Sequence, residues 1–236
     1  MWLREGVGVV YQSYMLLTRF LDDVAHAEGD ALYGAMVFVM LDRALDEMIS
    51  RGLSQGPYHR GTPSPWSHCV LLAEPYRGSE TRILDCCIRD AQGGLLWDVD
   101  AKEALSIVFD STVGKGAGAI YDGRVSDYDH VRVKARGVKW LPGLGRERAA
   151  ALVAAAEALQ AKGIRYDLPG LLREMSRLFL GLTIPPQDGR LFCSAFLQKV
   201  YSQVLGADGD FADNVRDEDT TPDDIWYSSK GQNRIA

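Results

Sequence analysis

The sequence predicts a single α+β domain in which a small antiparallel sheet packs against amphipathic helices. Short apolar runs separated by tight turns, at residues 68–73, 82–88 and 95–99, are typical of an antiparallel meander. Longer segments, between residues 143 and 163 and from 193 to 204, repeat apolar residues at spacings of three and four. That spacing is typical of amphipathic helices.

The first 60 residues are predicted to form a separate helical extension. Apolar residues recur at helical spacing on both sides of Gly29-Asp30, first from Met15 to Val24 and again from Met36 to Leu45. Gly29 and Asp30 interrupt this pattern, so we expect a helical hairpin. The chain therefore divides into this extension, residues 1–60, and a second unit, residues 61–236.

The remaining elements follow from local composition. Residues 52–65 are rich in Gly, Pro, Ser and Thr and indicate a loop, and residues 102–109 are predicted to be a short helix. Residues 114–123 are read as a flexible Gly-rich connection, and the alternating segment 129–134 as a half-buried strand. The polar tail from residue 206, with its acidic run, is expected to wrap the surface.

Composition excludes several classes of function. Hydrophobic residues make up 47% of the 236 residues and charged residues 25%, as in ordinary soluble globular proteins. A formal net charge of −6 argues against a nucleic-acid partner, because no basic stripe is available to neutralise phosphates. No run of about 18 apolar residues predicts a transmembrane helix, and the N-terminus does not resemble a signal peptide. The default expectation is a cytoplasmic protein, with delivery by a phage or a secretion system as the alternative.

Four cysteines carry the next inference: Cys69, Cys86, Cys87 and Cys193. None forms a C-x-x-C pair, so neither a zinc site nor a redox motif is predicted, and no cofactor is expected. The adjacent Cys86 and Cys87 point to opposite faces of a strand. The pattern indicates reduced thiols rather than a disulfide framework.

Cys193 is the strongest candidate for a reactive group. It opens an amphipathic helix, where unpaired backbone N–H groups and the helix dipole stabilise a thiolate and lower its pKa. The same N–H groups could hold an oxyanion. The alternative is a buried core cysteine that behaves as a small apolar residue.

His68 is the candidate base. It begins an apolar strand, and the next predicted strand carries Asp85 in its middle. A carboxylate inside an apolar strand is costly without a partner, and orienting a histidine would be such a partnership. The other histidines, His26, His59 and His130, are more simply explained as surface residues.

The order of these residues resembles that in a known group of enzymes. Along the chain come Ser67-His68 opening a strand, Asp85 on the next strand, Tyr166-Asp167 after an Ala-rich helix, Cys193-Ser194 opening a helix, and Thr221-Pro222 near the C-terminus. This series, from about residue 64 to 228, resembles the permuted papain-like (NlpC-type) cysteine hydrolases. Their superfamily also includes lecithin:retinol acyltransferase.

The resemblance implies a permuted papain-like fold, a sheet or half-barrel against helices, and a role for each matching residue. Cys193 would be the nucleophile, His68 the base and acid, and Asp85 the group that fixes the imidazole tautomer. Tyr166 would line the cleft and bind substrate or help the oxyanion; the alternative is a packing aromatic. Asp167 is more simply a helix cap. Relatives often carry Glu where this chain has the shorter Asp85, and residues 1–60 have no counterpart in them.

Such a site would form a thioester acyl-enzyme. The first functional hypothesis is a cysteine amidase or peptidase acting on a cell-wall peptide (peptidoglycan) or another amide. The second is an acyltransferase or lipid-directed thiol hydrolase, in which the N-terminal hairpin covers an acyl chain. The third is a non-catalytic binding or assembly protein of the same fold. The sequence does not predict a metal site, and it does not determine the oligomeric state.

Overall fold

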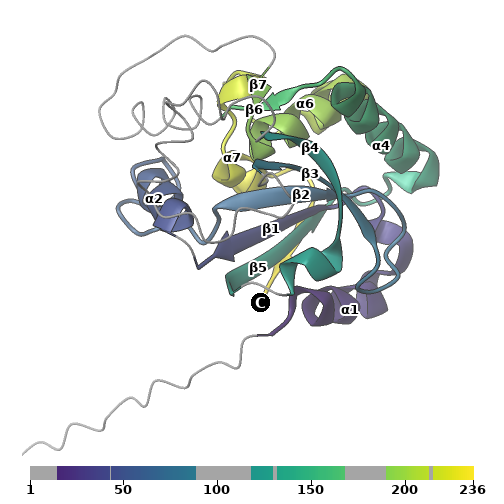
Figure 1. The fold of residues 1–236 in the computed structure, drawn as a ribbon, viewed down its shortest axis with the longest axis horizontal. Coiled ribbons are helices and arrows are strands. Elements are labelled where there is room, and N and C mark those ends of the chain that lie inside the picture. The colour runs from purple at the N-terminus through teal and green to yellow at the C-terminus, as the bar shows by residue number, and fades with distance from the viewer. Residues whose placement is uncertain (1–14, 43, 89–117, 130–131, 168–189, 213–214) are drawn as a thin grey trace, which may run out of the picture.

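The structure, a computed structural model, describes residues 15–42, 44–88, 118–129, 132–167, 190–212 and 215–236. One mixed sheet lies between helices on both of its faces (Figure 1), so the predicted α+β class is confirmed. The helices are α1 (Leu17–Glu28), α2 (Ala44–Leu53), α4 (Gly145–Ala161), α6 (Cys193–Leu205) and α7 (Pro222–Tyr227). The strands are β1 (Met36–Leu41), β2 (His68–Leu72), β3 (Arg82–Ile88), β4 (Gly118–Arg124), β5 (Val133–Trp140), β6 (Arg165–Tyr166), β7 (Arg190–Leu191) and β8 (Gln232–Ile235). Short 3-10 turns include η1 (Gly29–Leu32), η2 (Val125–Tyr128), η3 (Gly206–Gly209) and η4 (Asp217–Asp219).

The sheet has the strand order β7-β6-β4-β3-β2-β1-β5-β8. All of its pairs are antiparallel except β6 with β7. The ladder between β2 and β3 is short, since it joins only Leu71 to Leu84 and Leu72 to Ile83. The first three residues of β2 therefore lie beyond the end of this ladder, at the place where the candidate site is found.

The predicted N-terminal helical hairpin is wrong in its second half. α1 and α2 are helices, but residues 36–41 form β1, which lies between β2 and β5. These six residues are all apolar and all buried, as expected for a central strand covered on both faces. A short apolar run fits helical spacing equally well, so its periodicity could not separate the two. The sheet thus includes a strand from the region assigned to the extension.

Three smaller expectations also need correction. The Gly-rich connection ends in a strand, β4, and the strand expected at residues 129–134 begins at Val133 instead. The tail from residue 206 contains α7 and β8, and α7 buries Ile225 and Trp226. The predicted strand 95–99, the predicted helix 102–109 and the helix proposed to follow Asp167 lie outside the described residues. β2, β3, α4 and α6 confirm the corresponding predictions.

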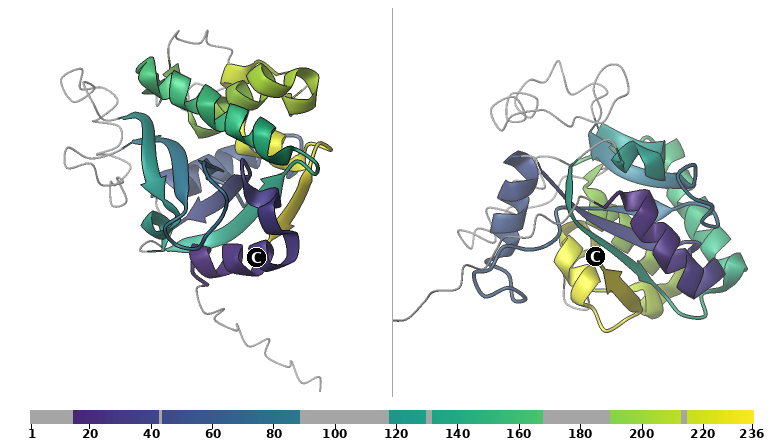
Figure 2. Two further views of the ribbon diagram at one scale, coloured as in Figure 1. Left: turned by 90° about the vertical axis from the view of Figure 1, so that its right-hand side faces the viewer. Right: turned by 90° about the horizontal axis from the view of Figure 1, so that it is seen from below.

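The two faces of the sheet carry separate cores. On one face α4 and α6 cover the alternate residues Cys69 and Leu71 of β2, while α1 covers Val70 and Leu72 on the other (Figure 2). Alternation along a strand explains this division. Cys86, which belongs to the core beneath α6, follows the same rule on β3.

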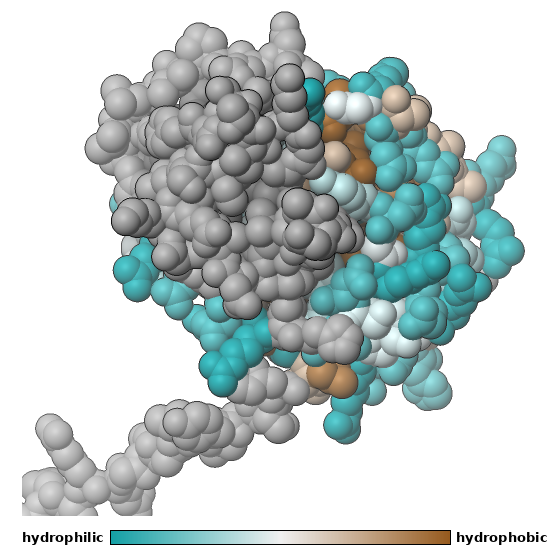
Figure 3. Space-filling view, in the orientation of Figure 1, coloured by the Kyte–Doolittle hydropathy of each residue, from teal (hydrophilic) through white to brown (hydrophobic). Residues whose placement is uncertain are grey.

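The described surface on the side of α4 is mainly hydrophilic (Figure 3). No helix within the described residues is long and apolar enough to cross a membrane.

Candidate functional site

Three predicted site residues meet where β2 begins. His68 is the first residue of β2, Asp85 lies in β3, and Cys193 is the first residue of α6. All three are nearly buried, with exposed fractions of 7% for His68, 0% for Asp85 and 4% for Cys193. The structure therefore brings together one residue from each of three elements that are far apart in the sequence.

The imidazole of His68 is held by Asp85. The Nε2 of His68 lies 2.8 Å from the Oδ1 of Asp85, a hydrogen-bond distance for a charge-assisted pair. The shorter Asp therefore reaches the ring without the extra methylene of Glu. Because Nε2 is engaged by the carboxylate, Nδ1 is the ring nitrogen left to serve the thiol.

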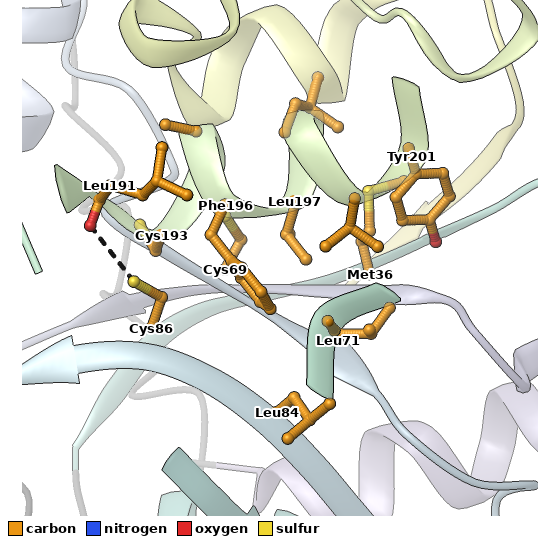
Figure 4. Close-up of a cluster of buried hydrophobic side chains, with 14 of the residues drawn as sticks. Met36, Cys69, Leu71, Leu84, Cys86, Leu191, Cys193, Phe196, Leu197 and Tyr201 are labelled. Atoms are coloured by element: carbon orange, nitrogen blue, oxygen red, sulfur yellow. Dashed lines mark hydrogen bonds between the residues drawn. The ribbon is translucent and has the colours of Figure 1, made fainter. Parts of the chain in front are cut away.

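The Cys193 side chain lies beside two consecutive residues of β2. The side chains of His68 and Cys69 and the backbone of Cys69 all act to lower the pKa of its thiol. The early end of the β2–β3 ladder explains this access, because the first residues of β2 have no Cα partner on β3. Figure 4 shows Cys193 above the strand residues Cys69 and Cys86.

The electrostatics favour a thiolate–imidazolium pair. A hydrogen bond from the Cys69 side chain holds the pKa of Cys193 well below its ordinary value, against the opposing effect of burial, and the charge of His68 adds to this. Burial lowers the pKa of His68, but the charges of Asp85 and Cys193 outweigh burial and raise it to about 10. The directions of both shifts favour a proton on His68 and a negative charge on the Cys193 sulfur.

Asp85 remains ionised although it is fully buried. Burial raises the pKa of this carboxyl, yet the charge of His68 and hydrogen bonds from His68, Cys87 and Tyr128 bring it below the ordinary value. Tyr128 donates from its hydroxyl to Oδ2 of Asp85 at 2.9 Å. Both oxygens of the carboxylate are thus satisfied, as a buried charge requires.

The segment that leads into Cys193 is anchored on both sides. The carbonyl oxygen of Leu191 accepts from the Cys86 thiol at 3.3 Å and from the backbone N–H of Asp167 at 3.0 Å (Figure 4 shows the first). Tyr166 pairs with Leu191 in the parallel β6–β7 ladder and is half-buried against the core beneath α6. The predicted cleft residue Tyr166 therefore lies beside the strand that ends two residues before the sulfur.

The first turn of α6 offers an anion site at the sulfur. Phe192 has an extended backbone and makes no side-chain hydrogen bond to cap the helix. The backbone N–H groups of the first turn have no partner within a helix, and they concentrate the positive end of its dipole. They are therefore available to a thiolate or to an oxyanion formed from a bound carbonyl.

A second group of polar residues joins the loop before β2 to α7. His59 Nε2 lies 2.9 Å from Asp223 Oδ2, and the Ser64 hydroxyl donates to Asp223 Oδ1 at 2.7 Å. The Tyr58 hydroxyl donates to Asp224 at 3.2 Å. The expectation of a surface position is wrong for His59, whose side chain is 8% exposed, and the expectation of a solvated acidic run is wrong for Asp219, Asp223 and Asp224, which are buried. A charge run in sequence does not reveal that partners converge on it from elsewhere in the chain.

Two contributors to the site were missed from the sequence. The alternation of β2 places Cys69 on the face of α6, a signal that was available once Cys193 had been assigned to that helix. Tyr128, in η2, had no such signal, since its contact with Asp85 is a product of tertiary folding. Among the described residues, no group of three His, Cys, Asp or Glu side chains is arranged to hold a metal ion.

No protein-family model matches this sequence, and none of the curated proteins compared with it matches. The interpretation of the site therefore rests on the geometry and electrostatics given above.

Proposed function

We propose that the protein is a cysteine-dependent hydrolase of the amidase or peptidase type, with Cys193 as nucleophile, His68 as base and acid, and Asp85 as the residue that orients His68. The observation that carries this proposal is the convergence of the three groups at the start of α6, with His68 Nε2 2.8 Å from Asp85. A nucleophile, a base and a group that orients the base are the parts that covalent catalysis needs. The permuted papain-like resemblance fits this order of residues along the chain and stays part of the proposal.

In the first half of the reaction, the Cys193 thiolate attacks the carbonyl carbon of an amide. The new C–S bond pushes an electron pair onto the carbonyl oxygen, where N–H groups at the start of α6 stabilise the charge. His68 then donates its proton to the leaving nitrogen, and the C–N bond breaks. A thioester on Cys193 and a free amine result.

In the second half, water replaces the amine. Neutral His68 takes a proton from the water as it attacks the thioester carbon, and the C–S bond breaks to return the thiolate. The carboxylic acid product leaves, and the imidazolium is restored. Throughout, Asp85 keeps the proton-bearing Nε2 fixed, so that Nδ1 faces the reacting atoms.

The acyltransferase alternative gains no support from the position of α1. α1 packs on the face of the sheet opposite α6, so it does not cover the Cys193 sulfur. The proposal of an acyl-chain cover formed by this helix is therefore set aside, and water remains the proposed acceptor.

Selective alkylation tests whether Cys193 is activated. At pH 6, iodoacetamide should modify Cys193 faster than Cys69, Cys86 or Cys87, as followed by peptide mass spectrometry of the folded protein. An activated thiolate reacts at a pH where ordinary thiols are protonated. Labelling of Cys193 no faster than that of Cys69, or only after unfolding, would support the third hypothesis of a binding or assembly protein and contradict ours.

Substrate class calls for a separate assay. The protein and its Cys193→Ala variant are incubated in parallel with peptidoglycan fragments and with acyl lipids. Release of a new amine or carboxylate from the peptide substrate by the parent alone supports the amidase assignment. Turnover of the lipids alone would overturn it in favour of a lipid-directed enzyme.

A further inference from the structure

Besides His68 and the side chain of Cys87, the buried carboxylate of Asp85 has a further donor that matters for the proposed reaction. Its Oδ1 is used by His68, and its Oδ2 accepts from the Tyr128 hydroxyl at 2.9 Å. Tyr128 is itself 1% exposed, so water does not compete for this hydroxyl. A carboxylate removed from water depends on every such donor to stay ionised.

Tyr128 also borders the ring that Asp85 holds. Its ring lies nearly parallel to that of His68, with an interplanar angle of 18° and 6.2 Å between centroids. Tyr128, which also packs in the core on the α1 face, thus contacts both the acid and the base, and any effect of its hydroxyl on the sulfur passes through these two groups.

The position of Tyr128 is fixed from outside the site. Asp129, the next residue, accepts from the backbone N–H of Thr18 at 3.0 Å and from the Thr18 hydroxyl. Thr18 belongs to the first turn of α1, so the carboxylate also satisfies a helix-terminal donor. This contact ties η2, which ends at Tyr128, to the N-terminal helix.

From this geometry we infer that Tyr128 is a positioning residue of the site: its hydroxyl keeps Asp85 ionised and fixes the plane in which that carboxylate holds His68. The inference rests on the proposed function. Without the hydroxyl, Asp85 takes up a proton at a higher pH and ceases to support the imidazolium of His68. The thiolate of Cys193 then loses its counter-ion over part of the acidic range.

The test is the pH profile of Cys193 alkylation by iodoacetamide in the full chain, compared with the Tyr128→Phe variant. The acid limb of the profile should move upward by about one pH unit, the size expected for loss of a hydrogen bond to a charged group. Tyr76→Phe is the matched control, because the Tyr76 hydroxyl donates at 2.9 Å to the Thr18 carbonyl and to Asp22 of α1. It weakens a contact of the helix that anchors η2 and leaves the hydrogen bond from Tyr128 to Asp85 in place. Its profile should superimpose on that of the parent.

Two further measurements separate positioning from general stability. In an Asp85→Asn background, adding Tyr128→Phe should leave the profile unchanged, since the hydroxyl acts through the carboxylate. Replacing Tyr128 with 3-fluorotyrosine preserves the shape and makes the hydroxyl a stronger donor, so the acid limb should move downward. This variant keeps the inference testable if Tyr128→Phe does not fold.

The outcomes distinguish the two proposals. A parent protein whose Cys193 titrates like an ordinary thiol overturns the proposed function itself. If Cys193 of the parent is alkylated at an unusually low pH and the profile of Tyr128→Phe superimposes on that of the parent, only the role of Tyr128 is overturned. Equal shifts in Tyr128→Phe and Tyr76→Phe also overturn it, by assigning the effect to general loosening of the fold.

Discussion

The Cys193 sulfur lies among three kinds of donor, two from the start of β2 and one from the start of α6. The imidazolium of His68 supplies charge, Cys69 supplies a thiol and a backbone group, and the first turn of α6 supplies helix-terminal N–H groups. Burial alone would favour the neutral thiol, so these donors together decide its state. Each of the side-chain contributions can be removed by a single substitution.

Asp85→Asn removes the charge behind His68 and keeps the side-chain volume. Because the charge of Asp85 is the foremost cause that raises the pKa of His68, we expect that pKa to fall and the imidazolium to be lost near neutral pH. Alkylation of Cys193 at pH 6, and any amidase activity, should drop by about 10²-fold or more. Parent-like rates at both pH 6 and pH 8 would show that Asp85 has only a structural role.

Cys69→Ala removes the thiol that bonds to Cys193, while Cys69→Ser keeps a donor of similar size. The pKa of Cys193 should rise by about one unit in the alanine variant, since a donor to a charged sulfur is lost. The serine variant should stay near the parent. The pKa is read from the rise in thiolate absorbance with pH, and an unchanged value in Cys69→Ala would refute the assignment.

At the scale of elements, an aromatic cluster beneath α7 supports the strand that begins with His68. Trp66 and Trp226 lie with ring centroids 4.3 Å apart, and Phe38 of β1 contacts both. The two indoles occupy the space over Gly137 of β5, where a Cβ would come within 2.5 Å of Trp66 and 2.7 Å of Trp226. The glycine is therefore required by close packing.

Gly137→Ala should displace these rings and lower the free energy of unfolding by about 1–3 kcal/mol, the usual cost of overpacking a core. Chemical denaturation measures the loss. Trp66→Phe in the same chain removes the nearest atoms, so the double variant should lose less than the sum of the two single changes. Strictly additive losses would mean that the clash is not with Trp66.

How far the sequence predicts these elements depends on how local their causes are. α4, α6, β2 and β3 are anticipated because an apolar stripe or a short apolar run bounded by turns is a local signal. The sequence does not predict β1, because this strand is apolar on both faces. That pattern follows from its central place in the sheet and is not a local signal of a strand. The same holds for the site: His68, Asp85 and Cys193 are recognisable by residue type and order, whereas Tyr128 is not.

At the scale of the whole molecule, the C-terminal segment secures the loop that precedes β2. α7 begins with a capping box, in which Thr221 and Asp224 bond each other's side chain and backbone. Its neighbour Asp223 holds His59 and Ser64, and Lys139 of β5 donates to the carbonyl oxygens of Trp226 and Ser228 at 3.0 and 2.8 Å. The hydrogen bonds of Asp223 thus join α7 to the loop that precedes His68, more than 150 positions earlier in the chain.

Asp223 makes this attachment dependent on pH. Burial raises the pKa of its carboxyl from 3.8 to about 6, against the hydrogen bond from Ser64 and the charge of His59. The folded state therefore binds this proton more tightly than the unfolded chain. The stability that Asp223 contributes is fully present below pH 4 and is lost as pH rises through 6.

Asp223→Asn is expected to abolish this dependence, because the amide keeps an acceptor for Ser64 and does not titrate. The difference in unfolding free energy between variant and parent, measured by denaturation at pH values from 4 to 8, should move in favour of the variant as pH rises through 6. A difference that is constant over this range would contradict the raised pKa. A difference that moves in favour of the parent as pH rises would mean that the ion pair between Asp223 and His59 stabilises α7 more than burial of the ionised carboxylate destabilises it.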